Sequence, residues 1–246
     1  MSVFMRSSTD PLPPITGQDD FSYYSLRDAS RIARIPITRL RRWMAAGVVT
    51  PSRQVRSPSD VIVERGFSLT DVGYLHLLRH LRTKGISLEE SVEHLHSLLN
   101  RFGPPGPKWR DSRLTILADH SRRTSRLTKH TLIASVADVW EDTVAVPGRQ
   151  GASQRVWLSL LEILPDEVSL ETILVPHEFL AHVEISPNKA DGLPVARGTN
   201  VRTAVIRSLL DQMSIDEFHR DIYPHVSKLS AMRCAEFERD LDKAAA

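Results

Sequence analysis

The chain has 246 residues, 41% of them hydrophobic and 25% charged, and its formal net charge is +2. This length and composition predict one or two globular domains, and the absence of any run of about 18 apolar residues argues against a membrane-spanning helix. The one cysteine, Cys234, excludes an internal disulfide. Because residues 1–20 lack the apolar core of a signal peptide, we expect a cytoplasmic protein.

The charge is unevenly distributed along the chain. Residues 21–103 hold 13 basic and 7 acidic side chains, residues 104–165 hold 9 and 6, and residues 166–246 hold 9 and 14. A basic front half suits the neutralisation of DNA phosphates, whereas an acidic rear half suits a basic protein partner. Residues 1–20 are poor in periodicity and rich in Pro, Ser and Asp, so they are predicted to form a flexible tail.

Two short helices are predicted at the start of the first domain, which spans residues 21–103. Ser25 can cap the first helix, Pro36 breaks the chain, and Gly47 ends a second helix in which Trp43 faces the first. The outer, cationic face of this second helix carries Thr38, Arg39, Arg41 and Arg42. Two short helices, a tight turn and a cationic outer face predict a helix-turn-helix.

A wing and two further helices are predicted to follow. Residues 48–67 are rich in Val and interrupted by Pro, Ser and Gly, as in a small hairpin, and they carry Arg53 and Arg65 for phosphate or minor-groove contacts. The segments SLTD (68–71) and SLEE (87–90) have capping-box spacing, so each is predicted to begin a helix. The run GPPGP that follows must end the second of these helices.

The segments YSLRDASRIARIPITRLRRWMAAGVVTPSR and RGFSLTDVGYLHLLRHLRTKGISLEESVEHL resemble the DNA-binding domain of MerR-type regulators. The helix cap of that family, its Gly-aliphatic-aliphatic-x-Pro pattern after the second helix and its LRxxGISLEE ending occur in order. The resemblance implies a winged helix-turn-helix that binds double-stranded operator DNA. The residues implicated in DNA contact are Ser25, Thr38, Arg39, Arg41, Arg42, Arg53 and Arg65.

The sequence also departs from the MerR pattern. Arg42 replaces an aromatic residue, and Met44 stands where the family usually carries an acid. MerR-type regulators continue into a long antiparallel dimerisation helix, which GPPGP interrupts here, and a single cysteine rules out a thiolate metal sensor. The resemblance therefore supports DNA binding, but neither metal sensing nor the usual dimer of the family.

Residues 104–165 are predicted to form a connector that mixes helix and strand. Residues 127–146 fit helix and strand about equally well, and the segment RVWLSLLEIL (155–164) is too apolar for a loop. Residues 171–185 alternate in part and are compatible with a β-hairpin that could pair two chains.

Residues 166–246 are predicted to form strands followed by three helices. Gly198 permits a turn, and Thr199 can cap the first of these helices. The segment SIDE (214–217) is a capping box that begins the second helix, and the third is predicted over residues 228–241. The apolar stripes of the first two helices contain Val201, Val205, Ile206, Leu209, Leu210, Ile215, Phe218 and Ile222.

The segment from Ile185 to Leu241 is similar to the small helical domain of certain VapB-type antitoxins, which carry I-x-x-P, then G-x-P-x-x-x-G-T and a later Tyr-Pro step. The matching positions are Ile185, Pro187, Gly192, Pro194, Gly198, Thr199, Val201, Ser214, Glu217, Tyr223 and Pro224. The resemblance implies a PIN-like ribonuclease toxin as partner. The partner-binding module that it implies includes Gly192, Pro194, Arg197, Gly198 and Thr199. Asn200 replaces the usual basic residue, so the family's role is not carried over to that position.

The sequence predicts no catalytic, cofactor or metal site. His76 and His80 are spaced i, i+4, but no carboxylate or cysteine completes a zinc site, so these two residues, with His94 and His96, are interpreted as surface histidines. Cys234, on an amphipathic helix, is interpreted as a small buried apolar residue. No Gly-rich phosphate loop or nucleophile elbow is found, so the chain is not expected to be an enzyme.

The fold class expected is mainly α with a small β component: an N-terminal winged helix-turn-helix, a central α/β connector and a C-terminal three-helix, helix-turn-helix-like module. The favoured hypothesis is a homodimeric repressor that acts as an antitoxin, binding operator DNA with its front half and a toxin with its rear. A ligand-responsive MerR-like transcription factor with a small-molecule pocket in the central region is the alternative. A nucleic-acid-modifying enzyme would need a convergent acid or metal site, which the sequence does not show.

Overall fold

The computed structural model describes residues 23–56, 62–103, 105–106, 108–109, 115–120, 127–133, 143–145, 153–159 and 169–245. These residues are mainly helical with a small β component, so the predicted fold class is confirmed. The chain divides into two compact units, Met1–Arg79 with Leu170–Ala246 and His80–Ser169. The flexible tail predicted at residues 1–20 lies outside the described residues.

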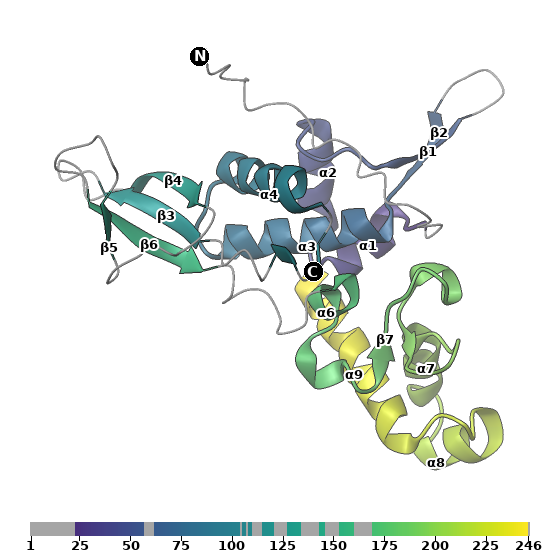
Figure 1. Ribbon diagram of the computed structural model, residues 1–246. Helices are drawn as coiled ribbons and strands as arrows, with labels where there is room; N and C mark the ends of the chain where they lie inside the picture. Colours follow the sequence, from purple (N-terminus) through teal and green to yellow (C-terminus); the bar gives the residue numbers. More distant parts are fainter. Residues whose placement is uncertain are drawn as a thin grey trace. The chain divides into compact units, whose positions relative to one another are not determined.

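The front of the first unit is a helix-turn-helix with a two-stranded wing (Figure 1). Its elements are α1 (Leu26–Ile32), α2 (Ile37–Ala45), β1 (Arg53–Arg56), β2 (Ile62–Gly66) and the larger part of α3 (Leu69–Thr83). The Ser25 side chain caps α1 by accepting a hydrogen bond from the backbone of Asp28. Gly47 follows α2 with a φ of +71°, a left-handed conformation that favours glycine and ends the helix as predicted.

The wing is an antiparallel hairpin that is tied at its base to the start of the domain. Arg53 of β1 lies opposite Gly66 of β2 in the register. Just beyond β2, the backbones of Tyr24 and Phe67 exchange two hydrogen bonds, with N···O distances of 2.9 and 3.0 Å. Both of these aromatic side chains are fully buried, so the hairpin grows out of the core of the domain.

The rear of the first unit is a helical module with one very short sheet. Its elements are α6 (Leu170–Leu174), η2 (His177–Phe179), β7 (Val183–Glu184), η3 (Ala190–Gly192), β8 (Val195–Ala196), α7 (Thr203–Leu210), α8 (Ile215–Glu217), η4 (Phe218–Ile222) and α9 (Lys228–Ala245). α7 packs against α9, and the core between the elements of this module contains Ile206, Phe218, Cys234 and Phe237, all fully buried.

Local signals located the helices of this module well. Both hydrogen bonds of the capping box predicted at residues 214–217 are present, between Ser214 and Glu217. The third predicted helix is α9, which runs four residues beyond the expected end at Leu241. Its Cys234 is buried as predicted.

Three expectations for the module were wrong. Residues 171–185 form no hairpin of their own: they contain α6 and η2, and β7 pairs with β8 of the same chain. Thr199 does not cap α7, which begins four residues later. Val205 and Ile222, assigned to apolar stripes, are 41% and 44% exposed.

The second unit contains the end of α3, a further helix and a four-stranded sheet. These elements are α4 (Leu88–Phe102), β3 (Thr115–His120), β4 (Leu127–Ile133), β5 (Thr143–Ala145) and β6 (Ser153–Ser159). α4 has the predicted capping box and ends before Gly103, whose φ is +77°. The strands are antiparallel in the order β4-β3-β6-β5. Within residues 127–146, the choice between helix and strand is thus settled as strand for β4 and β5.

Candidate nucleic-acid interface

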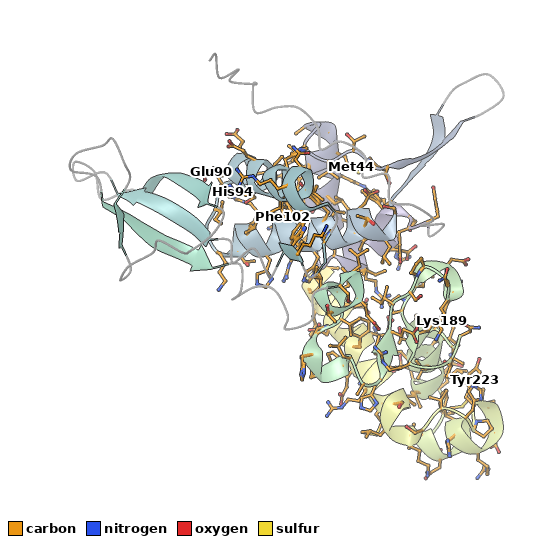
Figure 2. All side chains as sticks on the ribbon, in the orientation of Figure 1. Met44, Glu90, His94, Phe102, Lys189 and Tyr223 are labelled. Carbon is orange, nitrogen blue, oxygen red and sulfur yellow. The ribbon has the colours of Figure 1, made fainter. Side chains whose placement is uncertain are left out.

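The outer face of α2 carries a group of cations that have no carboxylate partner among the described residues. Leu40 and Trp43 are buried and hold the helix against the core, which leaves the opposite face open to solvent. That exposed face presents Thr38, Arg39, Arg41 and Arg42. In the described part of the chain, none of the three arginines forms a salt bridge with a carboxylate. Met44, labelled in Figure 2, is half-buried beside this face.

The wing adds two basic positions at its base. Arg53 of β1 lies opposite Gly66, and Arg65 of β2 lies opposite Gln54, so the backbones of the two arginines are one register step apart. The structure thus brings together two residues that are twelve positions apart in the sequence. Backbone placement of both at the base of a hairpin suits contacts with a phosphate backbone.

Ser25, which we also predicted as a DNA contact, has a structural role. Its Oγ accepts a hydrogen bond from the backbone N of Asp28 at 3.1 Å and donates to the Asp28 carboxylate at 2.6 Å. These two bonds hold the first turn of α1. The hydroxyl is therefore already engaged within the chain.

Asp71 links the wing to α3. Its carboxylate accepts hydrogen bonds from the backbone N of Ser68 at 2.9 Å and from the backbone N of Ser52 at 3.1 Å. Burial raises the pKa of Asp71, and the hydrogen bonds from Ser52 and Ser68 oppose that rise. The S-x-x-D pattern predicted the helix cap, but the bond to Ser52 joins residues nineteen apart and had no sequence signal.

Two arginines that the sequence analysis did not single out bind the rear module. Arg34, in the turn between α1 and α2, is 5% exposed and has a φ of +57°. Its Nη1 donates to the carbonyl oxygen of Leu174 at 3.0 Å, and its Nε and Nη2 lie 3.2 Å from the carboxylate of Asp240. The guanidinium also lies 5.9 Å from the ring centroid of Phe237. Burial lowers the pKa of Arg34, and Asp240 partly restores it.

Arg31, in the last turn of α1, makes the second contact with α9. It forms an ion pair with Glu238, and its Nε lies 2.6 Å from the carboxylate of Asp242. Glu238 is 1% exposed and also accepts a hydrogen bond from the hydroxyl of Thr203. Burial alone would raise the pKa of Asp242, but hydrogen bonds from Arg31 and Arg207 outweigh it and lower that pKa.

The residues predicted for partner binding gather at the turns around β8. The carbonyl oxygen of Gly192 accepts a hydrogen bond from the Tyr24 hydroxyl at 2.5 Å, and that of Pro194 accepts one from the backbone of Thr203 at 3.0 Å. Arg197 donates to the carbonyl oxygens of Leu180 and Val183 and pairs with Glu171.

Gly198 and Thr199 complete this group. The backbone N of Gly198 donates to Glu184 at 3.2 Å, and Gly198 has a φ of +76°. The Thr199 hydroxyl donates to the carbonyl oxygen of Ala196 at 2.8 Å and accepts from the backbone of Val201 at 3.0 Å. In this structure all five predicted residues hold the turns that precede α7, and Arg197 and Gly198 are exposed.

One of the four histidines interpreted as surface residues, His94, is buried. His94, labelled in Figure 2, is 4% exposed, and His76, His80 and His96 are only partly exposed. His94 lies on the face of α4 that packs inward, and the lack of further zinc ligands, on which the surface interpretation rested, carries no information about burial. Among the described residues, no group of three or more His, Cys, Asp or Glu side chains is arranged to hold a metal ion.

Burial raises the pKa of the Cys234 thiol to about 12. No described helix combines the length and the apolarity needed to cross a bilayer.

Comparison with known proteins identifies the front of the chain. Residues 24–98 match the family described as MerR HTH family regulatory protein. This segment, which contains the helix-turn-helix, the wing, α3 and most of α4, is a MerR-family helix-turn-helix domain, and it points to a DNA-binding transcription regulator.

A solved structure is similar to most of this chain. The crystal structure of Rv2018 from Mycobacterium tuberculosis is similar at 15% sequence identity and a TM-score of 0.49, over 86% of this chain and 96% of that one. No curated protein matches the chain significantly.

Proposed function

We propose that this protein is a repressor that binds operator DNA with α2 and the wing, and that it acts as the antitoxin of a toxin–antitoxin pair. The observation that carries the DNA-binding half is the exposed face of α2, where Arg39, Arg41 and Arg42 face solvent without a carboxylate partner among the described residues. That face belongs to the segment that matches the MerR family.

The chemistry of the arginine side chain assigns a role to each basic position. A helix-turn-helix places its second helix in the major groove, where a guanidinium can donate two hydrogen bonds to O6 and N7 of a guanine. Arg41 and Arg42 are our candidates for base contacts, while Thr38 and Arg39 suit the phosphates nearby. Arg53 and Arg65, at the base of the wing, suit phosphate or minor-groove contacts.

Replacing Arg41 and Arg42 by alanine tests this interface. Each arginine that reads a base should cost about 1–3 kcal/mol of binding free energy when truncated. The measurement is fluorescence anisotropy on DNA from upstream of the chain's own gene, at one fixed salt concentration. Arg220→Ala is the control, because Arg220 is an exposed arginine of the rear module and pairs with Asp221. If the double variant binds as tightly as the unmodified protein, the assignment of α2 as the recognition helix is wrong.

The proposed assembly on DNA is a homodimer. Two-fold symmetry would present two recognition helices to successive major grooves, with half-sites about 34 Å apart. Footprinting of the operator should then show two related half-sites, and light scattering should give twice the chain mass.

The toxin-binding half of the proposal is supported by the VapB-type pattern and by the exposed turn that contains Arg197 and Gly198. The partner expected is a PIN-like ribonuclease encoded beside this chain. Toxin binding and DNA binding would involve the same compact unit of this chain. The toxin would therefore also tune repression of the shared operon.

Co-expression of the full chain with the product of the adjacent gene tests this half. We expect stable capture, lost in Gly198→Val, because a β-branched residue is strained at a φ of +76° and the turn must change. Gly103→Val is the matched control: Gly103 has a φ of +77° and, like Gly198, open space where a Cβ would lie. Absence of capture by the unmodified chain would remove the antitoxin role and favour a ligand-responsive regulator, with DNA binding unaffected.

A further inference from the structure

Five charged residues join the helix-turn-helix to the last helix of the chain. Arg31 and Arg34 come from the end of α1 and the turn after it, and Glu238, Asp240 and Asp242 come from α9. We call this set the ionic latch. The two sides are more than two hundred residues apart in the sequence, and no other acidic residues of the described chain pair with these two arginines.

Arg34 of the ionic latch lies in the turn between α1 and α2. Arg34 is one of four residues between the two helices, and its backbone is in the left-handed region. Within the helix-turn-helix, the turn is closed by hydrogen bonds between Ser30 and Ile35, with the backbone N of Ile35 2.8 Å from the Ser30 carbonyl oxygen. The Arg34 side chain, in contrast, is fixed entirely from outside, by Leu174 and Asp240 of the rear module.

We infer that Arg31 and Arg34 are positioning residues for DNA recognition, held in place by the α9 carboxylates, so that the rear module is required for tight operator binding. The inference rests on the DNA-binding half of the proposed function. A helix-turn-helix reads DNA only if its second helix enters the groove at the correct angle, and the side chains of α2 must be held close to that geometry. The module therefore acts on DNA affinity without touching DNA.

Electrostatic repulsion alone predicts the opposite change in operator affinity when the α9 carboxylates are removed. Removing an acidic side chain from a DNA-binding protein reduces repulsion from the phosphates and should tighten binding. Loss of the latch should weaken binding, because Arg31 and Arg34 lose the acceptors that fix the turn. The direction of the change in operator affinity thus separates the two accounts.

The test compares Asp240→Ala/Asp242→Ala with Glu236→Ala in the full chain. The three carboxylates lie on α9 and have similar side-chain exposures of 48%, 46% and 43%, but Glu236 pairs with Arg233 of its own helix. At matched salt, and well below the unfolding temperature, we expect the double variant to bind operator about fivefold more weakly or worse, as coupled contacts of this kind imply. Glu236→Ala should bind as tightly as the unmodified chain or slightly more tightly. Double-variant binding equal to or tighter than that of Glu236→Ala overturns the inference.

Amide hydrogen exchange tests the ionic latch independently of DNA binding. The amides of Arg34 and Ile35, which donate to the carbonyls of Arg31 and Ser30, should exchange faster in the double variant than in Glu236→Ala. Unchanged exchange at these two amides overturns the inference even if affinity falls. If the unmodified chain binds no operator, the proposed function fails, while the exchange data still decide whether the latch holds the turn.

Discussion

Arg34 is only 5% exposed, although arginine is among the residues least often found inside proteins. Its guanidinium is accommodated because a carbonyl oxygen and a carboxylate accept its N–H groups and the ring of Phe237 covers it. The acidic balance of the rear half, which we interpreted as suited to a basic partner, is in part used within the chain, since Glu238, Asp240 and Asp242 pair with arginines of α1 and its turn.

A second residue-scale constraint lies at Gly66, at the end of the wing. A Cβ added there would lie 2.2 Å from Cε2 of Tyr23 and less than 3 Å from two further atoms of the ring. Gly66→Ala should therefore lower the free energy of unfolding by about 1–3 kcal/mol through overpacking. Urea denaturation measures this change.

The matched background for this variant is Tyr23→Ala, which removes the ring that the new methyl group would meet. In that background Gly66→Ala should cost much less, because the two substitutions are coupled. An equal cost in both backgrounds would show that the ring is not what excludes a side chain at position 66.

At the scale of elements, the junction of wing and α3 depends on Asp71. Its carboxylate satisfies backbone N–H groups of Ser52 and Ser68, so one side chain both caps a helix and fixes the entry to the hairpin. A hairpin of two short strands is not stable alone, and the wing requires such attachments to keep its direction.

We expect Asp71→Ala to lower the free energy of unfolding by about 1–2 kcal/mol, since a cap and a second bonded N–H lose their acceptor. Asp71→Asn keeps an acceptor oxygen and should lose less. Chemical denaturation of both variants at neutral pH makes the comparison, and equal losses would contradict the role given to the acceptor.

The difference in the free energy of unfolding between the unmodified chain and Asp71→Asn should also depend on pH. Because burial raises the pKa of Asp71, the folded chain binds that proton more tightly than the unfolded chain does. The protein should therefore gain stability relative to Asp71→Asn as pH falls from 7 through the folded pKa toward the unfolded value of about 3.9. A difference that is constant over this range would show that Asp71 titrates normally.

At the scale of the whole molecule, the two ends of the described chain meet in one compact unit. α1 contacts α9, the Tyr24 hydroxyl bonds to Gly192, and a Cβ at Gly73 would lie 2.6 Å from the side chain of Leu170. The helix-turn-helix and the rear module are therefore joined by packing contacts and ion pairs. Binding of a partner at one of them can thus alter the other.

Acid should weaken the contact between α1 and α9, because the Asp242 carboxylate loses its charge. Its folded pKa is lowered, so its contribution to stability is present above the unfolded pKa of about 3.9 and is lost as pH falls through the folded value. Thermal unfolding of the unmodified chain and of Asp242→Asn should differ at pH 6 and converge as pH falls through the folded pKa of Asp242. A gap that persists at low pH would mean that the Asp242 charge does not cause it.

Elements whose signals are local could be predicted from the amino-acid sequence. Ser25, Ser87 and Ser214 cap helices because each hydroxyl lies within reach of a backbone N–H group three residues later. Gly47 and the GPPGP run end helices because φ and the missing N–H of proline act within one or two residues. The cationic face of α2 also followed from spacing alone, since an amphipathic helix has one buried stripe.

Contacts between groups that are distant in the sequence could not be predicted and became known from the folded chain. Val205 and Ile222 satisfy a helical apolar pattern yet are exposed, because burial depends on what packs against a helix and not on its own period. Short apolar stretches such as β4 and β6 fit helix and strand alike until a neighbouring strand supplies hydrogen bonds. The partners of Arg31 and Arg34 are set by packing across more than two hundred residues, a distance at which charge pattern carries no information about contact.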